Sequence, residues 1–158
     1  RSTIIFDTGK MLKVEEKKLL SVCTAVECIH SYSLIHDDLP CMDNDLTRRG
    51  KPSTHKKFGE ATAVLAGNSL LTLAFEIISN KKNFLSPKQK NEIINLLSYC
   101  SGHTGIAGGQ ELDLKFENKR KNISKYSTEN STYKKRYDNY MYFAFLQINL
   151  SIKLWSFL

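Results

Sequence analysis

Four aspartates fall within nine residues of this sequence, and two arginines follow them closely. The segment DDLPCMDND runs from Asp37 to Asp45, and Arg48 and Arg49 come soon after it. Carboxylate oxygens suit Mg²⁺, and a guanidinium pairs bidentately with phosphate oxygens. A metal held by carboxylates beside arginine is what a substrate with a diphosphate group requires. The alternative interpretation of such a cluster is a solvated helix end.

Asp37 and Asp43 can share one metal ion only if the chain bends between them. On an unbroken helix the two residues would lie about 240° apart, at roughly 100° per residue. Pro40 supplies a bend, because proline cannot donate a backbone hydrogen bond and its ring crowds the preceding turn. Acidic groups at a helix C-terminus also oppose the helix dipole, so Asp37 and Asp38 cost stability unless a cation compensates them.

A histidine precedes this cluster by almost two helical turns. His30 lies seven residues before Asp37, which predicts the same side of a helix at a distance of about 10 Å. A lone helical histidine is otherwise a satisfied core or surface residue. Its alignment with Asp37 makes His30 a candidate contact for a second anion.

Two helices are predicted to flank the aspartate cluster. Apolar residues recur at helical spacing between Glu15 and Leu39, where Pro40 ends or breaks the pattern. Residues 41–58 are polar and are expected to form a loop or a short irregular helix. A second helix is predicted over Ala61–Ser79, and because it is apolar on most sides we expect it to be buried.

A third helix is predicted to begin at Ser86-Pro87, with Ser86 as its N-cap and Pro87 at its first position. We find no segment with the alternation of a β-strand and no internal repeat. The predicted fold class is therefore all-α, with helices packed as a bundle.

Charge is distributed unevenly along the 158 residues, which have a net charge of +7 and room for one domain with a core. Residues 1–114 carry 14 basic and 13 acidic side chains, whereas residues 115–158 carry 9 and 3. A basic balance favours a nucleic-acid or phosphate partner. Because the excess lies in the tail and no groove-reading motif accompanies it, we expect no nucleic-acid partner.

The remaining features bear on the cellular compartment. The cysteines form no CxxC pair, which favours free thiols in a reducing cytoplasm over a disulfide framework. The N-terminus lacks a signal-peptide pattern, so we expect the sequence to start inside a longer protein. Met141–Leu158 is apolar but interrupted by Gln147, Asn149 and Lys153, which favours a frayed or partner-seeking segment over a stable membrane span.

Residues 29–78 closely resemble the trans-polyprenyl diphosphate synthases, particularly the bacterial-type farnesyl diphosphate synthases. Asp37–Asp43, DDLPCMD, looks like the family's first aspartate-rich motif in its longer form, and the expected RRGKP follows it. Gly108–Leu114, GGQELDL, is similar to the family's GGQxxDL signature. The resemblance covers roughly residues 1–116.

This resemblance implies an isoprenoid synthase helical bundle, incomplete in this chain and usually a homodimer in the family. It implies a Mg²⁺-dependent prenyltransferase that ionises an allylic diphosphate, geranyl or dimethylallyl, and condenses it head to tail with isopentenyl diphosphate to give farnesyl diphosphate. Asp37 and Asp43 would bind the Mg²⁺, with Asp38 in support. Arg48 would contact the allylic diphosphate.

The resemblance also assigns roles to the remaining candidates. Arg49, His30 and Arg1 would hold isopentenyl diphosphate. Tyr32 stands where the family floors its product cavity, and a bulky ring there favours the fifteen-carbon product. The alternative is that Tyr32 simply packs between helices.

The resemblance stops after Phe116, so we expect a partial polyprenyl synthase domain over residues 1–116 and a divergent basic tail over 117–158. The family continues with a Lys-Thr motif and a second DDxxD, whereas Asp138 is the only aspartate in the tail. The tail composition is typical of a disordered segment, or of a shifted reading frame in AT-rich DNA. Two function classes stay open: a prenyltransferase by descent, and an inactive remnant or non-catalytic subunit. We expect little or no turnover from this chain alone.

Overall fold

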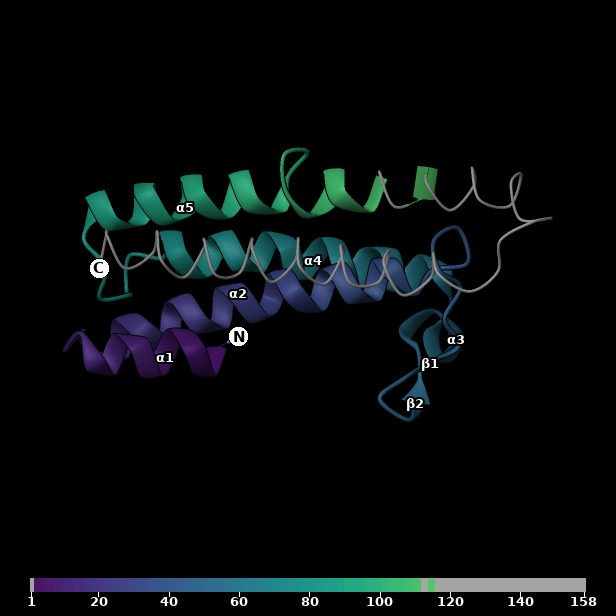
Figure 1. Ribbon diagram of the computed structural model, residues 1–158, viewed down its shortest axis with the longest axis horizontal. Helices are drawn as coiled ribbons and strands as arrows, with labels where there is room; N and C mark the ends of the chain where they lie inside the picture. Colours follow the sequence, from purple (N-terminus) through teal and green to yellow (C-terminus); the bar gives the residue numbers. More distant parts are fainter. Residues whose placement is uncertain (1, 112–113, 116–158) are drawn as a thin grey trace, which may run out of the picture. The chain divides into compact units, whose positions relative to one another are not determined.

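The computed structural model describes residues 2–111, 114 and 115 (Figure 1). The chain forms two compact units, Arg1–Ile94 and Asn95–Phe157, and most of the second lies outside the described residues. The regular elements of the described part are α1 (Ser2–Met11), α2 (Glu16–Asp37), β1 (Thr47–Arg48), β2 (Lys51–Pro52), α3 (Thr54–Phe58), α4 (Glu60–Ser79) and α5 (Pro87–Ser101). The predicted all-α class is confirmed, apart from one very short hairpin.

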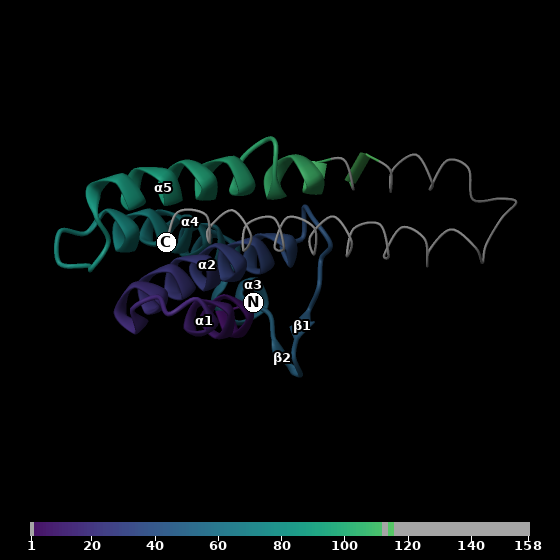
Figure 2. The same cartoon turned by 60° about the vertical axis from the view of Figure 1, so that its left-hand side comes forward.

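Helix α2 is the centre of the first unit. It packs against α1 and, over a longer contact, against α4 (Figures 1 and 2). Its fully buried side chains include Leu19, Val22 and Ala25, which follow the apolar spacing that predicted this helix. The helix ends at Asp37, two residues before the predicted end, because the chain begins to turn at Asp38.

A β-hairpin replaces part of the loop predicted over residues 41–58. Strands β1 and β2 pair antiparallel, with Arg48 opposite Lys51. Arg49 and Gly50 connect them with φ angles of 52° and 75°. Two positive φ values in a two-residue connection are typical of a type I′ turn. The strands were not predicted, because two residues are too few for alternation to be visible.

Helix α4 has the predicted extent, but the expectation that it is buried is wrong for part of its surface. Its buried residues are Ala63, Gly67, Ala74 and Ile78. Several apolar side chains of α4 remain exposed in the described part of the chain, among them Val64, Leu65 and Leu73. The reason is that α4 packs on α2 and α3 but is not surrounded by helices of its own unit. By length and composition alone, α4 could also cross a membrane.

The start of α5 matches the prediction in detail. The Gln89 backbone N–H donates to Ser86 Oγ at 3.2 Å, and the Ser86 N–H donates to Gln89 Oε1 at 2.9 Å. This reciprocal pair is a capping box, with Pro87 at the first helical position.

All four cysteines are free thiols, as predicted. The predictions for residues 117–158 lie outside the described residues.

Candidate functional site

The chain reverses direction immediately after α2, in a segment that we call the aspartate turn, residues 37–44. The Leu39 N–H donates to the His36 carbonyl at 3.1 Å, which tightens the helix end. The Asp43 N–H then donates to the Asp37 carbonyl at 3.0 Å. The bend predicted at Pro40 is confirmed, and it joins the backbones of two aspartates that an unbroken helix would separate.

The carboxylates of the aspartate turn suit a metal that is completed by a ligand. Asp37 is half-buried and Asp43 is exposed. Among residues 2–111, 114 and 115, no group of three or more His, Cys, Asp or Glu side chains could hold a metal. Mg²⁺ is commonly held by one or two carboxylates together with substrate phosphates. The carboxylates of Asp37 and Asp43 have the hard oxygen donors that suit Mg²⁺ bound together with a phosphate ligand.

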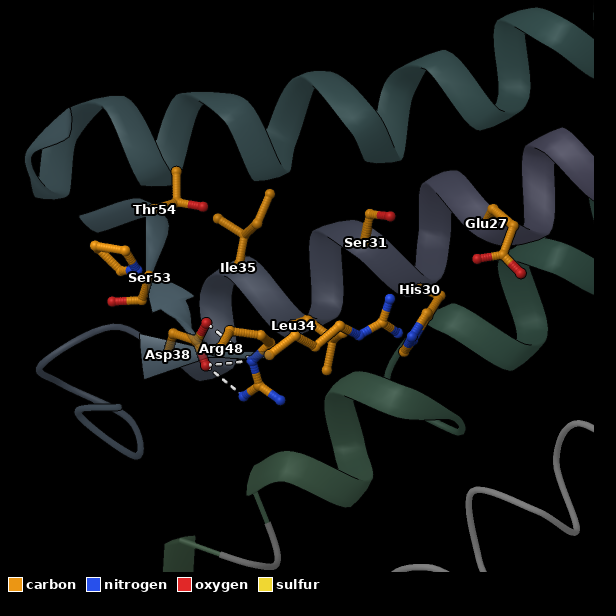
Figure 3. Close-up of a pocket in the computed structure, with 11 residues that line it drawn as sticks. Glu27, His30, Ser31, Leu34, Ile35, Asp38, Arg48, Ser53 and Thr54 are labelled. Atoms are coloured by element: carbon orange, nitrogen blue, oxygen red, sulfur yellow. Dashed lines mark hydrogen bonds and ion pairs between the residues drawn. The ribbon is translucent and has the colours of Figure 1, made fainter. Parts of the chain in front are cut away.

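The carboxylate of Asp38 is paired with an arginine. Asp38 is 3% exposed. Arg48 Nε donates to its two oxygens at 2.9 and 3.1 Å, and Arg48 Nη2 also donates to Oδ1 (Figure 3). This ion pair supplies the compensating cation that the sequence predicted for the acidic end of α2. The carboxylate of Asp38 is thus engaged by Arg48, and its expected support of a metal stays a prediction.

The ion pair also changes the electrostatics of Arg48. Its hydrogen bonds to Asp38 raise the pKa of the guanidinium; burial opposes this, and the charges of Asp38, Asp45 and Asp37 add to the increase. Arg48 therefore stays charged at any physiological pH. Arg48 Nη2 also lies 3.4 Å from Asp45 Oδ2. Since an arginine has five N–H donors and these two aspartates occupy only part of them, Arg48 can still donate to a further anion.

A pocket of about 240 Å³ lies between α2 and the hairpin (Figure 3). We call it the basic pocket, because it brings together His30, Arg48 and Arg49, three of the residues predicted to bind an anion. Its other lining residues are Glu27, Ser31, Leu34, Ile35, Asp38, Pro52, Ser53 and Thr54. The volume is slightly below the roughly 300 Å³ that marks the lower end of typical ligand pockets, which suits a small anionic group.

Other candidates lie elsewhere. Asp37, Asp43 and Tyr32 do not line the basic pocket. His30 and Asp37 were predicted to lie on the same side of the helix, but of the two only His30 borders this pocket. The acidic group at that end of the pocket is Asp38, because the hairpin holds Arg48 against it. Arg1 lies outside the described residues.

Glu27 is a charged pocket residue that the sequence reasoning missed. Burial raises the pKa of Glu27, but hydrogen bonds from Ser2 and the charge of His30 outweigh burial, so the net pKa is lowered. The Ser2 N–H lies 3.4 Å from Glu27 Oε1, and the Ser2 hydroxyl donates to the same oxygen. A signal was available, since Glu27, His30, Ser31 and Leu34 follow i, i+3, i+4 and i+7 spacing on one helix face.

Tyr32 belongs to a different side of α2. It is 7% exposed, and burial raises the pKa of its hydroxyl. Its ring meets the His36 ring edge to face, with 5.5 Å between centroids and an interplanar angle of 90°. His36 in turn reaches α4, where its Nε2 lies 3.1 Å from the Val64 carbonyl oxygen. Neither His36 nor its neighbour Gly67 was singled out from the sequence.

Comparisons with known proteins agree on one family. The family model described as polyprenyl synthetase matches residues 1–145. The farnesyl diphosphate synthase of Buchnera aphidicola subsp. Acyrthosiphon pisum is 51% identical over 125 residues, which are 78% of this chain and 44% of that protein. The family match runs past residue 116, and the boundary expected there stays a prediction.

Solved structures share the fold. An FPP/GFPP synthase from Zymomonas mobilis superposes with a TM-score of 0.79 at 38% identity, covering 97% of this chain and 52% of that one. A geranyltransferase from Helicobacter pylori, complexed with magnesium and isoprenyl diphosphate, gives a TM-score of 0.61 at 46% identity, covering 64% and 33%. The chain thus spans about half or less of the length of these relatives. The fold is the all-α fold of these synthases.

Proposed function

Because this chain belongs to the polyprenyl synthetase family, we propose that it serves isoprenoid biosynthesis as the diphosphate-binding part of a farnesyl diphosphate synthase. The proposed reaction is the Mg²⁺-dependent head-to-tail condensation of geranyl or dimethylallyl diphosphate with isopentenyl diphosphate, giving farnesyl diphosphate. The observation that carries the proposal is the aspartate turn. In it the Asp43 N–H donates to the Asp37 carbonyl, and the next residue, Asp38, pairs with Arg48.

In this proposal Asp37 and Asp43 hold Mg²⁺ together with the allylic diphosphate. Bound Mg²⁺ would neutralise the negative charge that develops on the departing diphosphate. Arg48 would donate its remaining N–H groups to the same diphosphate, while Asp38 keeps the guanidinium in place. The role of Asp38 in this proposal is support of Arg48.

We assign the basic pocket to isopentenyl diphosphate. Arg49 is exposed at the hairpin tip and has a planar guanidinium fork, and His30 lines the same pocket from α2. By the family pattern, Arg1 would complete this group. Tyr32 would limit product length to fifteen carbons, which is supported by its buried aromatic ring one helical turn before His36.

The second candidate is a non-catalytic subunit or an inactive remnant. It is favoured by the sequence of residues 115–158, in which Asp138 is the only aspartate. With only the carboxylates of the aspartate turn, the chain would hold a magnesium–diphosphate cluster weakly. We therefore expect binding without appreciable turnover from the 158-residue chain.

A homodimer is the proposed assembly, with exposed apolar side chains of α4 at its contact surface. Leu65 is 65% exposed, and Val64 and Leu73 of the same helix are each 39% exposed. We also propose a cytoplasmic location, which the four free thiols support.

The deciding experiment incubates the purified 158-residue chain with geranyl diphosphate, isopentenyl diphosphate and Mg²⁺, and measures farnesyl diphosphate against an EDTA control. Binding of inorganic pyrophosphate with and without Mg²⁺ is measured in parallel by calorimetry. Turnover supports the enzyme and refutes the expectation of an inactive chain. Mg²⁺-dependent binding without turnover supports the subunit or remnant. Absence of both would overturn the proposal.

A further inference from the structure

We propose that His36 is a positioning residue that clamps the last turn of α2 to α4 and thereby fixes the aspartate turn. His36 does not line the basic pocket, and it precedes Asp37 directly. It therefore acts through its neighbours and not on a ligand in that pocket. The relevance of this clamp to metal binding rests on the function proposed above.

The first support is that His36 bonds in two directions. Its main-chain carbonyl accepts the Leu39 N–H at 3.1 Å, at the start of the aspartate turn. Its side-chain Nε2 lies 3.1 Å from the Val64 carbonyl oxygen of α4. Because a carbonyl oxygen only accepts, Nε2 must carry the proton in this hydrogen bond. One residue thus links the beginning of the turn to a second helix.

The second support is the space that α4 leaves for the ring. A Cβ built on Gly67 would lie 2.9 Å from His36 Cε1 and still closer to Cδ2 and Nε2. Any residue larger than glycine would therefore displace the imidazole and break its bond to Val64. Glycine is unfavourable inside a helix, so its presence at the middle of α4 indicates that this space matters.

The third support is the ring of Tyr32, one turn earlier on α2. Its T-shaped contact with His36, at 5.5 Å and 90°, limits the orientations that the imidazole can adopt. The imidazole thus lies between the Gly67 backbone of α4 and the Tyr32 ring of α2. Its hydrogen bond to the Val64 carbonyl requires the tautomer with a proton on Nε2. The ring is held by packing as well as by a hydrogen bond.

The test measures how well the aspartate turn is held, by amide hydrogen exchange of the full chain in NMR spectra. The reporter is the Asp43 amide, which donates to Asp37; the Val26 amide, in the middle of α2, reports global opening. His36→Ala and Gly67→Ala should each speed exchange at Asp43 about fivefold, the equivalent of one lost hydrogen bond, and leave Val26 unchanged. His36→Gln, whose amide can donate to Val64, should restore slow exchange.

A double variant and a matched control complete the design. Gly67→Ala combined with His36→Ala should exchange no faster than either single variant, because both remove the same clamp. His103→Ala, at an exposed histidine, should change nothing. In wild-type spectra the ¹⁵N shifts of His36 should show a proton on Nε2.

The inference is overturned if Asp43 exchange stays slow in His36→Ala, if Asp43 and Val26 accelerate equally, or if the two substitutions add. Affinity for Mg²⁺ with inorganic pyrophosphate should fall in His36→Ala and Gly67→Ala and recover in His36→Gln. If wild-type protein binds no pyrophosphate, the proposed function fails, while the exchange data still decide whether His36 positions the turn.

Discussion

The two sides of α2 are built on different principles. The side facing the hairpin carries Glu27, His30 and Ser31 and borders a polar pocket. The side facing α4 meets buried small residues, Ala63, Gly67 and Ala74, that let the two helices approach closely. One side lines a pocket with polar side chains, and the other packs the helix that presents them against α4. One helix can therefore present residues to a ligand on one side and be fixed by packing on the other.

The largest expected effect separates two adjacent arginines on the pocket side. Arg48→Met leaves the Asp38 carboxylate buried without its partner and should destabilise the protein by about 3 kcal/mol, at the low end for a broken buried pair because Arg48 is a third exposed. Arg49→Met should change stability by no more than about 0.5 kcal/mol. Urea unfolding measures both.

The same pair of variants tests binding. Each should weaken the affinity for inorganic pyrophosphate in the presence of Mg²⁺, because each removes a guanidinium from the basic pocket. We expect Arg48 to stabilise the fold through Asp38 and Arg49 to contribute little to it. Equal stabilities of the two variants would contradict this difference.

The next effect belongs to the side that faces α4. Ala74 is fully buried, and Ala74→Leu adds volume that the packed helices must accommodate by shifting, at a cost of about 2 kcal/mol. The matched control is Ala61→Leu, the same substitution at an exposed position of α4. Thermal unfolding should show a lower midpoint for the first variant alone; a similar loss in both would place the cost in helix propensity and not in packing.

A smaller effect of opposite sign is expected at the hairpin tip. Arg49 adopts a φ of 52°, a left-handed conformation that disfavours arginine and suits asparagine before glycine in a type I′ turn. Arg49→Asn should raise stability by about 0.5 kcal/mol while weakening pyrophosphate binding. Lys51→Asn, in strand β2, is the control that should not stabilise. A drop in unfolding midpoint for Arg49→Asn would refute strain at this turn.

The smallest effect is a pH dependence at Glu27. Because the folded state lowers the pKa of Glu27 from 4.5, its carboxylate stabilises the protein above that pH, and this contribution is lost as the pH falls through the lowered value. The gap in unfolding midpoint between wild type and Glu27→Gln should therefore be present at pH 7 and close in acid. Ser2→Ala should shrink it, and a gap that widens in acid would contradict the sign.

Helices α2, α4 and α5 were predictable because their signals are local, whereas α1 was not predicted. Periodicity located α2 and α4, and Ser86 with Pro87 marked the start of α5 within its own sequence. Pro40 likewise predicted the bend that joins Asp43 to Asp37. The roles assigned to Asp37, Asp43, Arg49 and His30 stay predictions.

Features that depend on contacts between distant residues were not predictable. An aspartate in such a cluster can face a metal or an arginine, and only the position of the hairpin decides that Asp38 meets Arg48. The burial of α4 was overestimated, because apolar composition does not say how many neighbours a helix has. Gly67 carried no signal until His36 was seen against it.

The aspartate turn and the hairpin have a kinetic consequence. Their closing contacts, Asp43 to Asp37 and Arg48 to Asp38, span six and ten residues of chain. Loops of about ten residues close in roughly 10–100 ns, far faster than a domain assembles. The bond from His36 to Val64 spans 28 residues and must wait for α4 to dock. The contacts of Asp37 with Asp43 and of Asp38 with Arg48 can therefore form early in folding. Docking of α4 would then hold the aspartate turn in place through His36.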